Sequence, residues 1–276
     1  MRPFHPIVAL VALIGLAPPV AEAQSAKDVI NGMVAEYEKR MAGVTNYTLV
    51  QEAMGMPVTM YFEKETVDGR PVFRLRQSTV GGVAAPRAGK DEDEFDLYRE
   101  LPKLAERAVY KGRETVDGQA AHVVAVDDLK DIKMGRGMVP QGGDFEPRRA
   151  TVYVDTRLSV PRRMILEGQM RSEGRTTDVT TTIDLLDYRE VSGMLHPFRS
   201  TVRIEGLGKA VDPETRKQYD EMKKQLAEMP EAQRKMVEDM MKGRLAQMEQ
   251  MMGGDGGMNV EVVVRELRVN QGAPAR

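Results

Sequence analysis

Apolar and polar residues alternate along most of the chain with the period of two that is typical of β-strands. The clearest case lies at 178–185, where Val179, Thr181, Ile183 and Leu185 share one face. The same alternation occurs at 47–49, 58–62, 73–75, 150–154, 164–170 and 198–205, and a last strand is expected at 260–269. Turn signals separate several of these stretches, at Asp68-Gly69, Asp117-Gly118 and Ser192-Gly193. The pattern predicts a mainly antiparallel sheet with one face in water.

Helical spacing of apolar residues predicts two helices in the first half of the chain. The first helix is expected at 25–43, with Ser25 as its N-cap and Asp28 as the acidic partner of a capping box. The second is expected at 97–108, with Pro102 making its first turn irregular. Together with the strands, these helices predict an α+β fold.

Two glycine- and proline-rich segments interrupt the periodic pattern. Residues 81–94 end in an acidic run, and we expect an exposed, mobile loop there. Residues 127–148 predict a longer irregular segment, of the kind that forms a lid, a binding loop or a disordered stretch.

A helical insertion is predicted at 212–252, before the last strand. Asp212-Pro213 is typical of a helix start, and Pro230 divides the insertion into a hairpin of two helices. Nine of the 20 methionines of the chain fall between 222 and 258. They could fill an ordinary core, form an adaptable surface for a lipid or partner, or bind Cu(I) through thioethers. For the copper alternative the suggestive residues are Met236, Met240 and Met241.

The N-terminus has the features of a secretory signal peptide. Arg2 precedes an apolar stretch at 7–16, and Ala21-Glu22-Ala23 supplies the small residues that signal peptidase reads. We therefore expect cleavage after Ala23, a periplasmic mature protein and one domain at 24–276. An apolar stretch this short does not span a bilayer.

Composition excludes several kinds of function. The absence of cysteine excludes disulfides, cysteine-based zinc sites, a catalytic thiol and an N-terminal lipid anchor on cysteine. The formal net charge of −2 leaves no basic excess for nucleic acid. His122 is expected on a strand and His196 in the turn before Pro197, and neither has a carboxylate at metal-ligand spacing. Nucleophile and phosphate-binding motifs are missing. We therefore expect no enzyme activity, no cofactor and no metal site.

The residues from Thr151 to Glu205 resemble the outer-membrane lipoprotein-sorting (LolA/LolB-like) superfamily. The resemblance rests on the strand ending at Asp155, on Pro161-Arg162, and on the run from Asp187-Tyr188 to Ser192-Gly193 followed by Pro197. It extends over about 25–206 and the last strand, and the Met-rich insertion is outside it. The resemblance implies an unclosed β-barrel whose apolar concave face holds acyl chains beneath a helical lid.

From these observations the sequence predicts a periplasmic carrier or sensor of a lipid, acyl chain or other apolar ligand, with an acylated protein as a possible cargo. The alternatives are a protein-interaction module that docks through the Met-rich hairpin, and a Cu(I)-binding protein. The apolar strand faces are the candidate binding residues: Val58, Met60, Phe62, Met164, Leu166, Val179, Ile183, Leu185, Val202 and Ile204. The pattern leaves open whether they line a cavity or fill a core.

Overall fold

The computed structural model describes residues 25–67, 69–84, 97–129, 144–172, 175–210, 213–231, 233–235, 237 and 257–274. Within these ranges the strands form one 11-stranded antiparallel sheet in the order β4-β3-β2-β1-β11-β10-β9-β8-β7-β6-β5. The strands are β1 (Asn46–Ala53), β2 (Met56–Val67), β3 (Arg70–Val80), β4 (Val83–Ala84), β5 (Val109–Val116), β6 (Gln119–Asp127), β7 (Asp144–Asp155), β8 (Pro161–Ser172), β9 (Arg175–Val191), β10 (Met194–Glu205) and β11 (Met258–Val269).

The last strand joins the two halves of the sheet. Strands that follow one another in the chain are neighbours, except that β4 and β5 lie at opposite edges and β11 lies between β1 and β10. Asn270, just after β11, fixes the C-terminal end of this strand to the segment that precedes β1. Its Oδ1 accepts from the Thr45 backbone N–H at 2.7 Å, and its Nδ2 donates to the Gly43 carbonyl at 2.9 Å. The strands β4 and β5 are the two edges and do not pair with each other, so the sheet is not closed.

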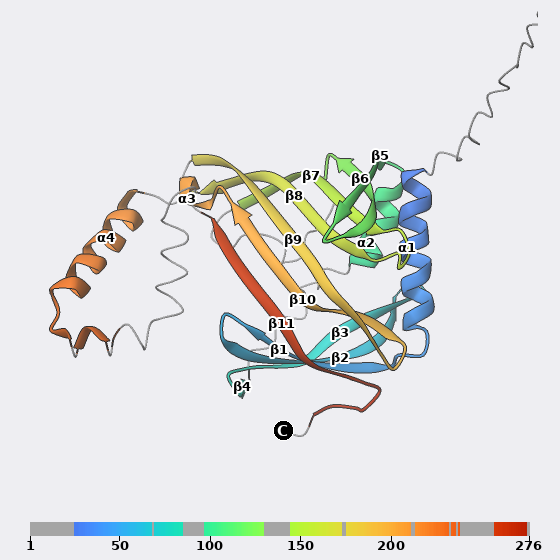
Figure 1. Ribbon diagram of the computed structural model, residues 1–276, viewed down its shortest axis with the longest axis horizontal. Coiled ribbons are helices and arrows are strands. Elements are labelled where there is room, and N and C mark those ends of the chain that lie inside the picture. The colour runs from blue at the N-terminus through green and yellow to red at the C-terminus, as the bar shows by residue number, and fades with distance from the viewer. Residues whose placement is uncertain are drawn as a thin grey trace, which may run out of the picture.

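The helix α1 (Ala26–Met41) begins as the sequence predicts, with a capping box between Ser25 and Asp28. It contacts β3 and β10 as well as β6, although β3 and β6 lie near opposite edges of the sheet. A sheet can touch one helix in this way only if it curves around it. Figure 1 shows α1 standing between the arm of β1–β3 and the arm of β5–β8. The unclosed half-barrel expected from the sequence is confirmed.

Cross-strand register identifies the concave face, because paired residues point to the same side of a sheet. Val202 pairs with Val260 on one side and Ile183 on the other, and Ile183 pairs with Met164. Met164 in turn pairs with Val152, which packs against the α1 cluster. These residues therefore lie on the concave face, the face that α1 covers.

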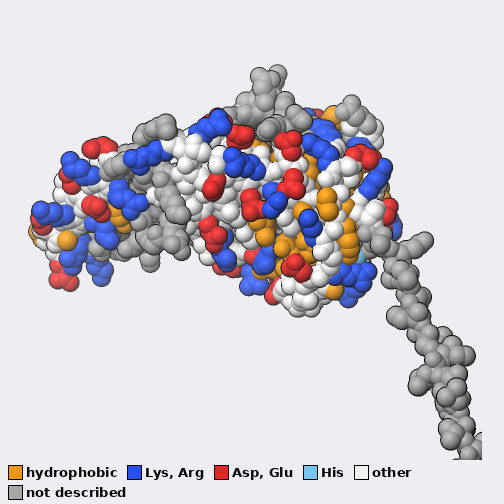
Figure 2. Space-filling model, turned by 90° about the horizontal axis from the view of Figure 1, so that it is seen from above, with side chains coloured by type: hydrophobic (Ala, Val, Ile, Leu, Met, Phe, Trp, Pro, Cys, Tyr) orange, Lys and Arg blue, Asp and Glu red, His pale blue; other side chains and the backbone are white. Residues whose placement is uncertain are grey.

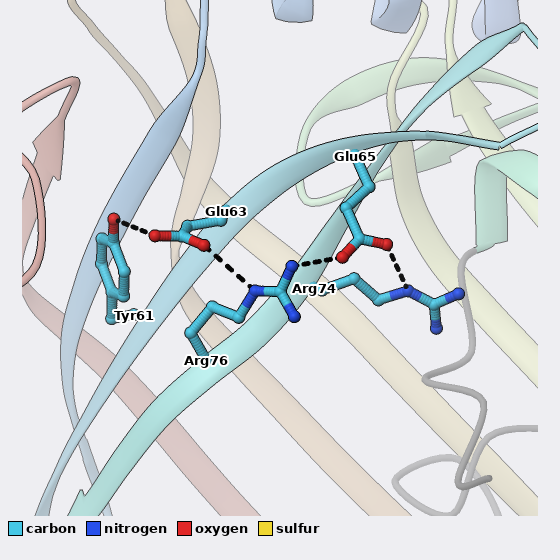
Figure 3. A network of polar contacts seen from close by, with 5 residues as sticks. All are labelled: Tyr61, Glu63, Glu65, Arg74 and Arg76. Carbon is cyan, nitrogen blue, oxygen red and sulfur yellow. Dashed lines mark hydrogen bonds and ion pairs between the residues drawn. The ribbon is translucent and has the colours of Figure 1, made fainter. Parts of the chain in front are cut away.

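The opposite, convex face carries charged side chains. On β2 and β3, Tyr61 donates to Glu63 at 2.9 Å, and Arg76 bridges Glu63 and Glu65 (Figure 3). Arg74 approaches the other oxygen of Glu65. On the side of the molecule drawn in Figure 2, basic and acidic side chains are interspersed, and some hydrophobic side chains are exposed among them. This division into an apolar and a charged face confirms the alternation read from the sequence.

Packed clusters occupy both ends of the concave face. At the α1 end, Met33 is fully buried and contacts α2 (Leu97–Ala105), Val124 and Val154. The C-terminal part of α1 packs against β1, β3, β10 and β11, where Phe198 and Leu267 are buried. At the far end, Leu207 of α3 (Leu207–Ala210) packs on β8, β9 and β10.

The turn from β10 into α3 requires glycine. Gly206 has a φ of +90°, which L side chains rarely adopt. A Cβ at this position would also lie 2.2 Å from the carbonyl oxygen of Asp178 on β9. The close approach of the turn to β9 places Leu207 in the far-end cluster.

Four boundaries differ from the sequence predictions. The helix α2 ends at Ala105 rather than at residue 108. The strand β7 begins at Asp144, and a bulge between Pro147 and Arg149 lets it include a proline, so 144–148 are not irregular. Val83–Ala84 form the short strand β4 inside the predicted loop. His196 lies within β10 and not in the turn, which is at Ser192-Gly193.

Part of the predicted insertion is described. The helix α4 (Pro213–Glu228) begins at the expected proline, and residues on the far side of Pro230 are also helical. The predicted signal peptide at 1–23, residues 85–94 and 130–143, and most of the predicted Met-rich second helix lie outside the described residues. In the described part of the chain, no helix is long and apolar enough to cross a membrane.

Candidate functional site

All ten binding residues predicted from the sequence lie on the concave face. The register joins Val202, Ile183 and Met164 in one row across β10, β9 and β8. Ile204 and Leu166 form the next row, and Val179 and Leu185 follow on the same face of β9. Val58, Met60 and Phe62 occupy the corresponding face of β2, where Phe62 pairs with Tyr47. Residues from strands distant in sequence are thus brought to one surface.

These ten residues do not share one environment. Leu166, Val179 and Ile204 belong to packed clusters, and Met60, Phe62 and Val202 pack against clusters. Ile183 is also buried, with 8% exposure. Val58, Met164 and Leu185 are half-buried and belong to none of these clusters. Seven of the ten residues are therefore buried or packed against the core, whereas Val58, Met164 and Leu185 keep partial exposure outside the clusters.

The middle of the concave face contains an apolar band. We define this band as the six half-buried side chains on the concave face of β1, β2, β8, β9 and β11 that neither belong to the four clusters nor pack against them: Ala53, Val58, Met164, Leu185, Val260 and Val262. They come from β1, β2, β8, β9 and β11. Apolar side chains on the inside of a curved sheet are usually packed, so their residual exposure marks the band as the candidate binding surface.

An exposed apolar rim adjoins the band at the β1–β2 and β3–β4 turns. Met54, Met56, Val80 and Val83 have exposures of 50%, 46%, 39% and 72%. Met56 pairs with Ala53, and Val80 pairs with Val58, so the rim continues directly into the band. A backbone hydrogen bond of 2.8 Å from Gly81 to the Pro57 carbonyl holds the two turns together.

Three uncharged polar side chains face the same region. Gln51 pairs with Val58 and Val264, Ser200 pairs with Val262 and Leu185, and Ser78 pairs with Met60. All three are half-buried. Within the described part of the chain, none of the three side chains makes a hydrogen bond. They are free to bind a polar group of a ligand.

Both histidines of the described chain face inward and are held neutral. The Nδ1 of His122 lies 3.1 Å from the Tyr110 hydroxyl, and desolvation followed by the nearby charge of Arg113 lowers the pKa of His122. Desolvation in the interior lowers the pKa of His196 to about 4. At neutral pH these rings can exchange hydrogen bonds but add no positive charge to the concave face.

Cations near the concave face are already engaged. The Lys64 ammonium donates to the carbonyls of Met41 and Ala42, at 3.0 and 2.9 Å, and so caps the C-terminus of α1. Arg189 forms an ion pair with Asp187 at 2.5 Å and lies over the Phe198 ring. These contacts leave the charges outside the apolar band.

The residues that carry the family resemblance form a structural cluster, which we call the Asp155 cluster. The buried Asp155 carboxylate accepts from Arg162 at 2.8 Å and from the backbone N–H groups of Arg157 and Leu158. Arg162 lies over the ring of Tyr188, whose hydroxyl donates to the Pro161 carbonyl. Desolvation raises the pKa of Asp155, but these hydrogen bonds outweigh it and lower the pKa overall.

The Asp155 cluster also positions α1. Arg40 on α1 donates to the Leu158 carbonyl at 2.7 Å, in the turn that Asp155 organises. The motif thus fixes the turn between β7 and β8 and holds the helix that covers the concave face. Its role in the described chain is structural.

The described residues contain no group of three histidine or acidic side chains arranged to hold a metal ion. Met236, Met240 and Met241, the residues of the copper alternative, lie outside the described residues. The Met-rich surface of the interaction-module alternative is largely outside them as well, so both alternatives stay predictions.

Comparison with known proteins adds distant structural likenesses. No family model and no curated protein matches the chain. Among solved structures it is similar to a DUF1329 family protein from Desulfovibrio piger, with 10% identity over 90% of this chain and 93% of the other and a TM-score of 0.39. It is also similar to a Vibrio parahaemolyticus domain named for outer-membrane lipoprotein sorting, with 12% identity, coverages of 90% and 95% and a TM-score of 0.40.

A third similar structure is a LolA superfamily protein from Nitrosomonas europaea, with 10% identity, coverages of 91% and 96% and a TM-score of 0.32. At such identities and TM-scores the likenesses assign no activity to this chain.

Sequence reasoning missed half of the apolar band. Ala53, Val260 and Val262 were not among the candidate residues, and neither were the polar residues Gln51, Ser78 and Ser200. Val260 alternates with Asn259 and Glu261, but Val262 begins a run of three valines in which alternation does not identify a face. What the sequence could not reveal is that β11 inserts between β1 and β10, which places these valines at the centre of the concave face.

Proposed function

We propose that this protein binds an apolar ligand, such as a lipid or an acyl chain, against the apolar band and acts as a non-catalytic carrier or sensor. The observation that carries the proposal is the contrast between the packed ends of the concave face and its half-exposed apolar middle. Covering apolar surface contributes roughly 25 cal/mol per Å². A ligand of acyl-chain size on the band would therefore gain substantial binding free energy.

The arrangement of the surrounding elements supports a route for such a ligand. The rim of Met54, Met56, Val80 and Val83 exposes apolar side chains to solvent and is continuous with the band. An apolar chain that enters over the rim would stay in contact with apolar side chains along its path. The resemblance to the LolA/LolB-like superfamily favours an acyl chain, free or attached to a protein, as this ligand.

A periplasmic location is part of the proposal and rests on the N-terminal sequence. Arg2, the apolar stretch at 7–16 and Ala21-Glu22-Ala23 have the order of a cleavable signal. Expression of the full chain in a bacterium with two membranes, followed by fractionation and N-terminal sequencing, should yield a periplasmic protein that begins at Gln24. A protein that retains Met1 in the cytoplasm would contradict this part.

Native mass spectrometry of the protein purified without detergent tests the binding function. We expect an adduct whose mass matches a lipid or an acylated peptide, which organic extraction would release and identify. The variant Leu185→Asp, which places a charge on the apolar band, should lose the adduct. Its matched control is Leu186→Asp, because Leu186 is the next residue on β9 and faces the convex side beside Arg199.

The result can contradict the proposal in two ways. A bare polypeptide mass, together with no binding of added lipids, would show that the band does not hold an apolar ligand. Equal retention of the adduct in Leu185→Asp and Leu186→Asp would place the ligand elsewhere on the molecule. Circular dichroism of both variants checks that the sheet is intact.

A further inference from the structure

The apolar rim contains a methionine at a backbone position that seldom accepts one. Met54 and Gly55 are the two central residues of the β1–β2 hairpin, with φ angles of 51° and 75°. Two-residue turns with positive φ at both positions favour asparagine, aspartate or glycine. Every other non-glycine residue with positive φ in the described part of the chain is an aspartate, an asparagine or a serine. A residue that breaks a local preference in this way is expected where the protein has a function.

The two rim methionines also differ from the other described methionines in exposure. Met54 and Met56 are both about half exposed, whereas Met33 is fully buried. The remaining methionines of the described chain are buried or half-buried: Met41, Met60, Met164, Met170, Met194, Met222, Met229 and Met258. A Cβ added at Gly55, between the rim methionines, would meet no atom within 4 Å. Small molecules in solution can therefore reach both thioether groups.

The neighbouring β3–β4 hairpin joins the two methionines to a continuous apolar surface. Val80 and Val83 pair with each other on either side of the turn. The backbone N–H of Gly81 in this turn donates to the carbonyl of Pro57, which directly follows Met56, at 2.8 Å. This hydrogen bond links the two hairpins, so their apolar side chains form one rim. A polar group introduced at either methionine would interrupt that rim.

The thioether is the group of the rim that can be modified by oxidation. The chain has no cysteine, so methionine supplies all of its sulfur. Hypochlorous acid converts a thioether to a sulfoxide: sulfur loses two electrons and gains an S–O bond, the O–Cl bond breaks, and chloride and a proton leave. The sulfoxide is polar, and methionine sulfoxide reductases return it to the thioether. In that reverse step two thiols form a disulfide, and the oxygen leaves as water.

We propose that Met54 and Met56 are a reversible oxidation site that regulates the binding of apolar ligands over the rim. Oxidation changes two of the four rim side chains from apolar to polar. An apolar ligand that covers a sulfoxide oxygen removes its hydration and offers no hydrogen-bond donor in return, which is unfavourable. The oxidised protein therefore binds apolar ligands more weakly. This effect on binding rests on the proposed function, whereas the selective oxidation of the two residues does not.

Peptide mass mapping tests the modification site itself. The mature full-length protein is titrated with hypochlorous acid, and the gain of one oxygen atom is followed at each methionine. We expect Met54 and Met56 to be oxidised at least about fivefold faster than Met33 and Met194, because oxidation follows exposure to the oxidant. Reductases specific for the two sulfoxide epimers, supplied with dithiothreitol, should reverse the change. Oxidation of the buried methionines at an equal rate would overturn the assignment.

Binding of the neutral fluorescent probe N-phenyl-1-naphthylamine tests the regulation. Oxidation of the wild-type protein should weaken probe binding roughly fivefold, and reductase treatment should restore it. The variant Met54→Leu/Met56→Leu keeps apolar side chains of similar volume, so it should bind the probe before and after treatment with the oxidant. The matched control is Met222→Leu/Met229→Leu, which removes two half-buried methionines in and next to α4. Figure 1 shows α4 apart from β4, so this control should respond to the oxidant as the wild type does.

The possible results separate the modification from the proposed function. An equal loss of probe binding in the oxidised wild type and in oxidised Met54→Leu/Met56→Leu would place the effect at other methionines and overturn the regulation. Unchanged probe binding in the oxidised wild type would overturn it as well. If the untreated wild type bound neither the probe nor added lipid, the proposed function and its regulation would fail together. Peptide mapping would still decide whether the rim methionines are the oxidation site.

Discussion

The two ends of the concave face and its middle are built from the same alternating strands but are packed differently. At the ends, helices cover the sheet: Met33 of α1 is fully buried, and Leu207 of α3 is 6% exposed. In the middle, Val262 and Leu185 face the same side without a helix of the described chain packed on them. Strand alternation determines which side chains turn inward, and the helices determine which of them become core.

Because of this difference, we expect residues at the packed ends to determine the stability of the protein and residues of the apolar band to determine ligand binding. Side chains at the packed ends hold the half-barrel in shape, so their loss should lower the free energy of unfolding. Side chains of the apolar band contribute less to folding, because solvent reaches them in the unliganded protein. Substitutions in the two regions should therefore differ in their effects, and four experiments examine this from the largest expected effect to the smallest.

The largest effect is expected at the Asp155 cluster, which holds α1 against the sheet. Asp155→Ala leaves the buried guanidinium of Arg162 without its carboxylate and removes the acceptor for two backbone N–H groups. Breaking a buried ion pair in this way costs about 3–5 kcal/mol. Urea denaturation should show this loss. A loss below about 1 kcal/mol would mean that α1 is held by other contacts.

Truncation of one side chain in each region tests the comparison directly. Met33→Ala removes a fully buried side chain from the α1 cluster and should cost about 2–5 kcal/mol. The matched variant Leu185→Ala removes a half-buried side chain from the band and should cost less than about 1.5 kcal/mol. Equal losses in thermal or urea unfolding would show that the band is packed core and not a binding surface.

The architecture was largely predictable because it depends on local patterns. Ser25 and Asp28 specify the start of α1. Asp117-Gly118 and Ser192-Gly193 specify hairpin turns, and these four turn residues all have a positive φ. Alternation then assigned all ten candidate residues to the correct face. These signals lie within a few residues of one another, so they can be read without knowledge of distant contacts.

The candidate site was only partly predictable because it depends on long-range pairing. Val260 and Val262 reach the centre of the concave face only when β11 pairs with β1, more than 200 positions earlier in the chain. The division of the ten residues into core and band depends on where α1, α2 and α3 pack. His196 was expected in a turn because Pro197 follows it, but β10 includes the proline.

A third experiment uses pH to examine the interior near the packed ends. The pKa of His196 is lowered from 6.5 to about 4 in the folded protein. The unfolded chain therefore binds more protons between these values, and stability falls as the pH decreases from 6.5 to about 4. The shift corresponds to a loss of about 3 kcal/mol.

The measurement is urea denaturation of the wild-type protein and of His196→Gln at pH 7 and pH 4.5. The wild-type protein should lose most of that stability at the lower pH, and the variant should lose clearly less. The lowered pKa of His122 acts in the same direction and would remain in the variant. Identical pH dependence of the two proteins would show that His196 is not desolvated.

The fourth experiment, which has the smallest expected effect, compares the hydroxyl groups of Thr181 and Ser200 on the same face of the sheet. Thr181 is 1% exposed, and its Oγ1 has no hydrogen-bond partner in the described part of the chain. Ser200 also lacks a side-chain hydrogen bond, but it is half-buried beside the apolar band. An unsatisfied buried hydroxyl costs about 1–3 kcal/mol, whereas a hydroxyl in contact with water costs little.

Thr181→Val should therefore stabilise the protein by about 1 kcal/mol, since valine has nearly the same shape and no polar group to desolvate. Ser200→Val should change the unfolding free energy by less than about 0.5 kcal/mol. Thermal unfolding of both variants provides the comparison. A gain in Ser200→Val as large as that in Thr181→Val would mean that Ser200 is sealed from water in the free protein. In that case it could bind a polar group of a ligand only after the sheet or its helices moved, and the open binding surface would be limited to the rim and the adjacent residues of β2.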